Sequence, residues 1–160
     1  MRFEFQIKDV NLYGELLYIQ NEQSLQYRPH NPNIGVGVIC GYYTELGVIC
    51  ETGEVVGFSG LNPHKTWITE SMNVPLAKQG RLWIHFNDPL MKGTGIEYNR
   101  TWHTYYDAEK QYICIGDYRT GNNDDCVEFA NNIIAVLRGD QLVAIWAKIK
   151  EVETAPQSVY

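Results

Sequence analysis

The amino-acid sequence predicts a mainly β fold: an antiparallel β-sandwich or barrel with meander and hairpin connections and at most one short helix. Twelve valines, fourteen isoleucines and eleven tyrosines stand against seven alanines, and β-branched and aromatic side chains suit a pleated, half-buried surface. Short apolar runs separated by Gly, Asn, Asp and Pro also recur along the chain, as they do in all-β domains.

The length and composition predict a single domain. The chain has 160 residues, of which 44% are hydrophobic and 20% charged, and these values are typical of one folded globular unit. We expect one β-rich domain over 1–152, followed by a short C-terminal tail over 153–160.

The first part of the chain contains one clear strand. Apolar and polar residues alternate over 2–7, which gives one dry face and one wet face. Residues 10–20 are ambiguous between helix and strand, and the Tyr-Gly pair within them favours the return strand of a hairpin. Residues 21–33 are rich in Asn, Gln, Pro and His, which predicts an exposed loop.

Three β-rich runs follow, over 34–40, 46–50 and 54–60. A turn at 51–54 joins the last two, and Gly53 supplies the positive φ that a tight hairpin needs. The first two runs both contain Gly-Val-Ile-Cys, which indicates neighbouring strands in similar environments rather than a repeat architecture.

A long irregular connection is predicted over 61–80, with a short helix at about 66–72. Connections of this length without regular structure are uncommon in compact domains and are often functional, so this segment is the first region of interest. Strands over 81–86, 96–106 and 112–115 follow it.

The last three predicted strands span 126–130, 133–138 and 142–149. Asn131-Asn132 and Gly139-Asp140 are the turns between them, because Asn, Asp and Gly tolerate left-handed backbone conformations. Both faces of the final two strands are apolar, so this hairpin is expected at the centre of the core, covered on both sides.

The charge pattern excludes several classes of protein. Thirteen Lys and Arg against nineteen Asp and Glu give a net charge of −6, with no basic cluster, so nucleic acid is not an expected partner. The longest apolar runs fall far short of the ~20 residues of a membrane-spanning helix. Charged residues at 4, 8 and 9 interrupt what would have to be an apolar export segment, so a cytoplasmic location is expected.

Neither a metal nor a cofactor is expected. The four cysteines, Cys40, Cys50, Cys114 and Cys126, include no Cys-x-x-Cys pair, and a reducing compartment favours free, buried thiols. Gly93-Thr94-Gly95 matches neither a P-loop nor a dinucleotide-binding fingerprint.

An enzyme hypothesis depends on acids and imidazoles at predicted strand ends. The candidates for a hydrolase site are His85, His103, Asp107 and Asp117. General acid–base chemistry needs such groups within one hydrogen bond of a substrate, and sequence spacing does not establish that they converge. A structural role at strand ends is the competing interpretation, and it is the one we favour.

The abundance of aromatic side chains favours a binding function without enzymatic activity. Exposed Trp and Tyr offer large rigid areas with a polar tip, and such residues dominate binding hot spots. The leading hypothesis is a small acidic cytoplasmic module that captures a protein partner, with a basic partner neutralised as an immunity or inhibitor protein does as one form of it. The residues proposed for that contact are Trp67, Trp102, Tyr105, Asp124 and Asp125.

A second hypothesis is a small-ligand or carbohydrate-binding barrel. In it, Trp83, His85 and Trp102 line the mouth of the barrel. The sequence leaves the oligomeric state, the strand order and the identity of the partner open.

Overall fold

The computed structural model describes residues 1–9 and 13–157, and the described chain is mainly β. One short 3-10 turn, η1 (His64–Thr66), accompanies the strands. The strands are β1 Arg2–Ile7, β2 Glu15–Ile19, β3 Ser24–Arg28, β4 Val36–Cys40, β5 Tyr43–Val48, β6 Val55–Leu61, β7 Ile68–Thr69, β8 Lys78–His85, β9 Thr94–Asn99, β10 Thr104–Asp107, β11 Tyr112–Gly116, β12 Asp125–Ala130, β13 Ile133–Arg138 and β14 Gln141–Val152.

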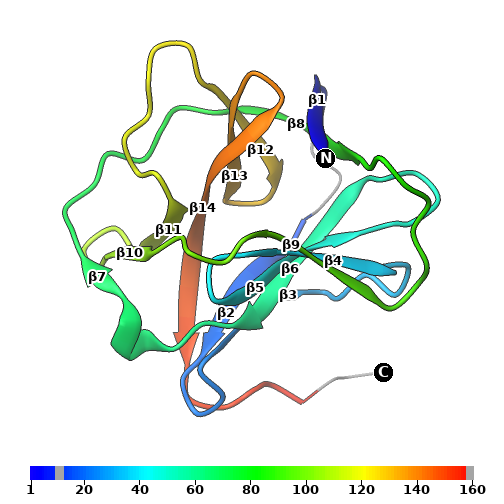
Figure 1. The fold of residues 1–160 in the computed structure, drawn as a ribbon. Helices are drawn as coiled ribbons and strands as arrows, with labels where there is room; N and C mark the ends of the chain where they lie inside the picture. Colours follow the sequence, from blue (N-terminus) through cyan, green and yellow to red (C-terminus); the bar gives the residue numbers. More distant parts are fainter. Residues whose placement is uncertain (10–12, 158–160) are drawn as a thin grey trace.

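The strands form one curled sheet with the shape of a half-barrel (Figure 1). Its main path runs β1-β8-β12-β13-β14-β2-β3-β6-β5-β4-β9, and β11, β10 and β7 branch from β14. The sheet is mixed, so the expectation of purely antiparallel pairing was wrong. Four pairs are parallel: β14 with β2, β12 with β8, β4 with β9, and β10 with β7. Each of these pairs joins segments far apart in the sequence, beyond the reach of a hairpin turn.

The curled sheet encloses the main core, and a second core lies on the outer face of β11, β13 and β14. Alternate residues of β13 and β14 enter the two cores, for example Ile145 inside and Trp146 outside. The prediction that the terminal hairpin is buried on both faces is therefore confirmed. Trp146 is fully buried, and its indole N–H has no hydrogen-bond partner in the described part of the chain.

An extended segment over 70–77, which we call the strap, covers the outer core. Met72 is buried among Trp146 and its neighbours, and Val74 and Ala77 pack beside it. The strap is held by its backbone: the Met72 N–H donates to Asp107 Oδ2 at 2.9 Å, and the Lys110 ammonium donates to the Met72 carbonyl.

Several local predictions are confirmed. The first strand spans Arg2–Ile7 as expected, and the hairpin between β5 and β6 turns at Gly53, whose φ is 77°. The two Gly-Val-Ile-Cys runs begin on neighbouring strands as expected: Gly37 is directly opposite Gly47 in the β4–β5 pair, and the antiparallel runs extend from there in opposite directions.

Two predictions for the N-terminal part were wrong. Residues 21–33 are not all loop, because β3 occupies the middle of this segment, with Leu25 and Tyr27 buried. The alternation of β3 spans only five residues, and it lies between stretches rich in Asn, Gln and Pro that are typical of a loop. The strand within 10–20 is β2, which pairs with β3 and β14 and not with β1, and residues 10–12 lie outside the described residues.

Two further predictions failed in the middle of the chain. The helix expected at 66–72 is absent from this described segment, which contains the end of η1 and then β7. The single strand expected over 96–106 is two strands, β9 and β10, which pair with different neighbours. The chain turns between them where Thr101 donates its N–H to Asn99 Oδ1 at 3.0 Å, a local bond that competes with strand pairing.

The strap should make stability depend on pH through Asp107, which is 4% exposed. The Met72 N–H, aided by the Lys110 N–H, holds the pKa of Asp107 below its ordinary value. Because the pKa of Asp107 is lower in the folded state, its carboxylate contributes to the free energy of unfolding. This contribution is complete above the pKa of the unfolded state, about 4, and is lost as the pH falls through the pKa of the folded state.

Asp107→Asn should therefore lower the urea midpoint at pH 7, and its difference from the wild type should shrink below about pH 4. The exposed residue Asp88 provides the matched control, Asp88→Asn, which should leave the urea midpoint unchanged. A difference that stays constant down to the acid transition would contradict this role for Asp107.

Candidate functional site

Four aromatic rings gather where the connection after β6 meets β2 and β10. We call Tyr18, His64, Trp67 and Tyr106 the Trp67 cluster. The centre of the Trp67 ring lies 4.7 Å from that of Tyr18, 4.9 Å from that of His64 and 5.1 Å from that of Tyr106. Tyr18 is buried in the main core, Trp67 and Tyr106 are half-buried, and His64 is exposed, so the cluster runs from the core to the surface.

A buried amide fixes this cluster. Asn62 is 1% exposed, and its Nδ2 donates to the hydroxyls of Thr44 at 3.2 Å and Thr104 at 2.9 Å. Its Oδ1 accepts from the Trp67 indole N–H at 2.9 Å, and its backbone carbonyl accepts from the Tyr18 hydroxyl at 3.0 Å. Asn62 thus connects β2, β5, β10 and the segment that carries Trp67.

The turn between β2 and β3 supports the same segment. The Asn62 N–H donates to the Gln23 carbonyl at 2.8 Å, and the His64 N–H donates to the Gln23 side-chain oxygen at 2.9 Å. Gln23 has a positive φ of 55°, which turns the chain so that both oxygens face this segment. A hollow of about 440 Å³ lies beside His64, lined also by Glu22, Gln23, Leu61, Pro63 and Lys65.

Four carboxylates accompany the cluster, and we call Glu22, Glu70, Glu151 and Glu153 the acidic rim. Each lies on an element bonded to the cluster or its support. Glu22 adjoins Gln23, the Glu70 N–H donates to the Tyr106 carbonyl, and the Glu153 carbonyl accepts from the Asn21 N–H. Glu151 of β14 lies opposite Tyr18 of β2 in the register of these two strands. Among the described residues, no ion pair includes any of the four.

One carboxylate of the rim, Glu151, acts electrostatically on the aromatic hydroxyls. Burial raises the pKa of Tyr106, and the charge of Glu151 raises it further. The pKa of Tyr18 is also raised, first by burial and then, against a lowering backbone hydrogen bond, by Glu151. Both hydroxyls therefore stay protonated at neutral pH.

Of the five residues predicted to contact a partner, only Trp67 belongs to this cluster. Trp102 is half-buried between β9 and β10, its ring centre 5.7 Å from that of Tyr98. Tyr105 packs on the outer core, 4.6 Å from Tyr118 between ring centres. Asp125 is exposed at the start of β12.

The carboxylate of Asp124 forms an ion pair within the fold. Its two oxygens accept from Nε and Nη2 of Arg138 at 2.9 and 3.0 Å, and its side chain is only 2% exposed. This bidentate pair, with the Gly121 N–H, holds the pKa of Asp124 below its ordinary value. The structure thus uses this carboxylate to fix the chain between β11 and β12.

The four residues predicted for a hydrolase site do not converge. His85 is on β8 and contacts Glu4 of β1. Asp107 binds the strap, at the far end of β10 from His103. His103 and Asp117 are neighbours, since the Gly116 N–H donates to the His103 carbonyl at 3.1 Å, but Asp117 contacts Arg119.

Of the three residues proposed for the mouth of a barrel, two share a strand face and the third lies apart from them. Trp83 and His85 are on the outer face of β8, and the guanidinium of Arg81 lies 5.2 Å from the centre of the Trp83 ring. Trp102 packs against the main core instead. Apolar side chains fill the interior of the curled sheet, so these residues do not open into a shared internal space.

The cysteines are free thiols, and burial raises the pKa of Cys40 to about 12. Burial, with a smaller effect of Asp117, also raises the pKa of Cys114. Within residues 1–9 and 13–157, no group of three or more His, Cys, Asp and Glu side chains is placed to hold a metal ion. The same residues include no helix with the length and apolarity needed to cross a bilayer.

Sequence reasoning missed Asn62, Tyr18, Tyr106 and the acidic rim. These positions are scattered from 18 to 153, and only the folded chain brings them together. One available signal was the Asn62-Pro63-His64 run at the start of the connection singled out above.

Comparison of the sequence with models of protein families, and with curated proteins, finds no match. The functional argument therefore depends on the geometry of the site itself.

The Asn62 network predicts a large effect of one substitution. Asn62→Ala would leave the Trp67 N–H and two buried hydroxyls without their partner, and each such loss costs about 1–3 kcal/mol. We expect a total loss of about 3 kcal/mol or more in the free energy of unfolding, measured by urea denaturation, with a changed near-ultraviolet tryptophan signal. The control Asn87→Ala, at an exposed position, should change neither. A loss below about 1 kcal/mol would contradict this role for Asn62.

Proposed function

We propose that this chain is a non-enzymatic binding module that captures a basic protein partner at the Trp67 cluster and its acidic rim. The observation that carries the proposal is an aromatic centre, partly exposed and rigidly held, accompanied by four carboxylates without ion pairs among the described residues. The proposal keeps Trp67 from the sequence-based hypothesis and adds residues that only the fold brings together.

The physics of interfaces supports this combination. Binding energy concentrates in a few aromatic or arginine residues near the centre of a contact, with polar residues around them. Trp67 already has its indole N–H bonded to Asn62, so its ring is ordered before any partner arrives. A side chain fixed in advance loses little entropy on binding.

The charge supports a basic partner. Unpaired carboxylates speed the encounter with a cationic surface and disfavour acidic partners. Elsewhere in the described chain, eight ion pairs occupy acidic residues, including Asp124 with Arg138 and Glu54 with Arg81, and other acidic residues, such as Asp88 and Glu128, belong to none. In this proposal the chain neutralises a basic target, as an immunity or inhibitor protein does. The four free cysteines support action in a reducing compartment such as the cytoplasm.

The proposal is tested with two variants of equal net charge. The rim variant carries Glu22→Gln, Glu70→Gln, Glu151→Gln and Glu153→Gln. The control variant carries Asp88→Asn, Glu109→Gln, Glu128→Gln and Asp140→Asn, which also belong to no ion pair among the described residues. The stoichiometric partner is recovered with the wild-type protein from its own cells, identified by native mass spectrometry, and titrated against each variant.

We expect a partner of protein size with a net positive charge. At low salt, the rim variant should associate about tenfold more slowly than the wild type, and the control variant within about threefold of it. If association slowed equally in both variants, the net charge alone would explain the slowing, and this result would contradict the assignment of the contact to the acidic rim. Recovery of the wild-type chain without any stoichiometric protein partner would contradict the proposed class of function.

A further inference from the structure

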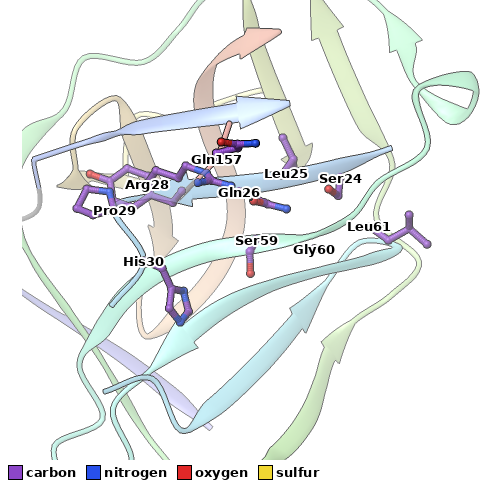
Figure 2. Close-up of a pocket in the computed structure, with 11 residues that line it drawn as sticks. Ser24, Leu25, Gln26, Arg28, Pro29, His30, Ser59, Gly60, Leu61 and Gln157 are labelled. Atoms are coloured by element: carbon purple, nitrogen blue, oxygen red, sulfur yellow. Dashed lines mark hydrogen bonds between the residues drawn. The ribbon is translucent and has the colours of Figure 1, made fainter. Parts of the chain in front are cut away.

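A pocket of about 620 Å³ with both polar and apolar walls lies on the outer face of β3. Ser24, Gln26 and Arg28 point to this face because they alternate with the buried residues of the strand. Figure 2 shows Gln157 beside Gln26 and Arg28, with His30 and Ser59 across the pocket from them. The volume is in the range of pockets that bind small molecules.

The pocket exists because two strands diverge. β3 pairs with β6 only over Ser24–Gln26, opposite Ser59–Leu61. Beyond that point β3 remains paired with β2, and β6 remains paired with β5. The space opens where the two pairs separate, next to Arg28.

The hydrogen bonds along β3 leave one end of the pocket cationic. Ser24 Oγ and Gln26 Nε2 both donate to Glu22 Oε2, at 3.2 and 3.0 Å. Gln26 Oε1 in turn accepts from Arg28 Nη2 at 2.9 Å. The carboxylate of Glu22 thus occupies one end of this row, and the guanidinium of Arg28 occupies the other.

Arg28 lacks the partners that such a group requires. Its Nε is buried and has no hydrogen-bond partner in the described chain, and no ion pair includes it there. The described chain has two half-buried cationic side chains, Arg28 and Arg81, and Arg81 is paired with Glu54. Leaving a half-buried cation without a counter-charge is costly, so the site favours an anion.

We propose that this pocket binds a small organic carboxylate, with Arg28 as its counter-ion. A guanidinium matches the planar, two-oxygen geometry of a carboxylate. Because Arg28 is one cation without a counter-charge, it matches the single negative charge of a carboxylate. Ser59, Gln157 and His30 line the pocket and supply hydrogen-bonding groups for a polar ligand body. The carboxylate belongs either to a free metabolite or to the C-terminus of a peptide.

The probe is N-acetylglycine, and its neutral isostere N-acetylglycinamide is the matched control. Each is titrated into the ¹⁵N-labelled protein, and the amide shifts of β3 and of Ser59–Leu61 are followed. We expect saturable shifts with N-acetylglycine at a millimolar dissociation constant, the affinity expected of so small a ligand, and none with the amide. A tripeptide with a free C-terminus, compared with its amidated form and with N-acetylglycine, distinguishes the two sources of the carboxylate.

Arg28→Gln should weaken the binding of N-acetylglycine at least tenfold, whereas Arg2→Gln, with the same change of charge at an exposed position, should leave it unchanged. If Arg28→Gln fails to fold, Ser59→Ala tests another residue that lines the same pocket, and it should weaken the binding of N-acetylglycine severalfold. Equal shifts with the acid and the amide, no saturable shift with either, or unchanged binding in a folded Arg28→Gln variant would each overturn the proposal.

Discussion

The hydrogen bonds of the buried Asn62 amide are the constraint on which the proposed site depends. The connection after β6 is irregular, so no strand ladder orders it, and Asn62 instead bonds it to Thr44 and Thr104. The same amide orients the Trp67 indole. Because the amide is enclosed, water does not replace a lost partner, and moving the connection would leave several buried polar groups unpaired. An irregular segment thereby gains a fixed position.

The rest of the fold provides the rigid base for this arrangement. β14 is twelve residues long, and it pairs along its length with β13, β11 and β2. Apolar side chains cover both of its faces in its first part, and its last residues carry Glu151 beside Tyr18. One strand therefore links the centre of both cores to the acidic rim. The strap completes the outer core, which would otherwise expose Trp146 and its neighbours.

The sequence predicted the features that depend on local patterns. Period-two alternation identified β1, and two-sided apolar runs identified β13 and β14 as central strands. The parallel pairs and β3 were missed, because pairing between distant segments leaves no local signal and the polar face of β3 resembles a loop. The same polar face lines the Arg28 pocket, so the misread segment carries a proposed site. Of the Trp67 cluster, only Trp67 itself was selected beforehand.

The most direct test uses the four tryptophans, which report on four different places. Trp67 lies in the proposed contact, Trp83 on the outer face of β8, Trp102 beside β9, and Trp146 beneath the strap. The measurement is a ¹⁹F spectrum of the 5-fluorotryptophan protein with and without the partner recovered from its cells, assigned with Trp→Phe variants. The account predicts a large shift of the Trp67 resonance alone. A shift of Trp83 or Trp102 with Trp67 unmoved would contradict it.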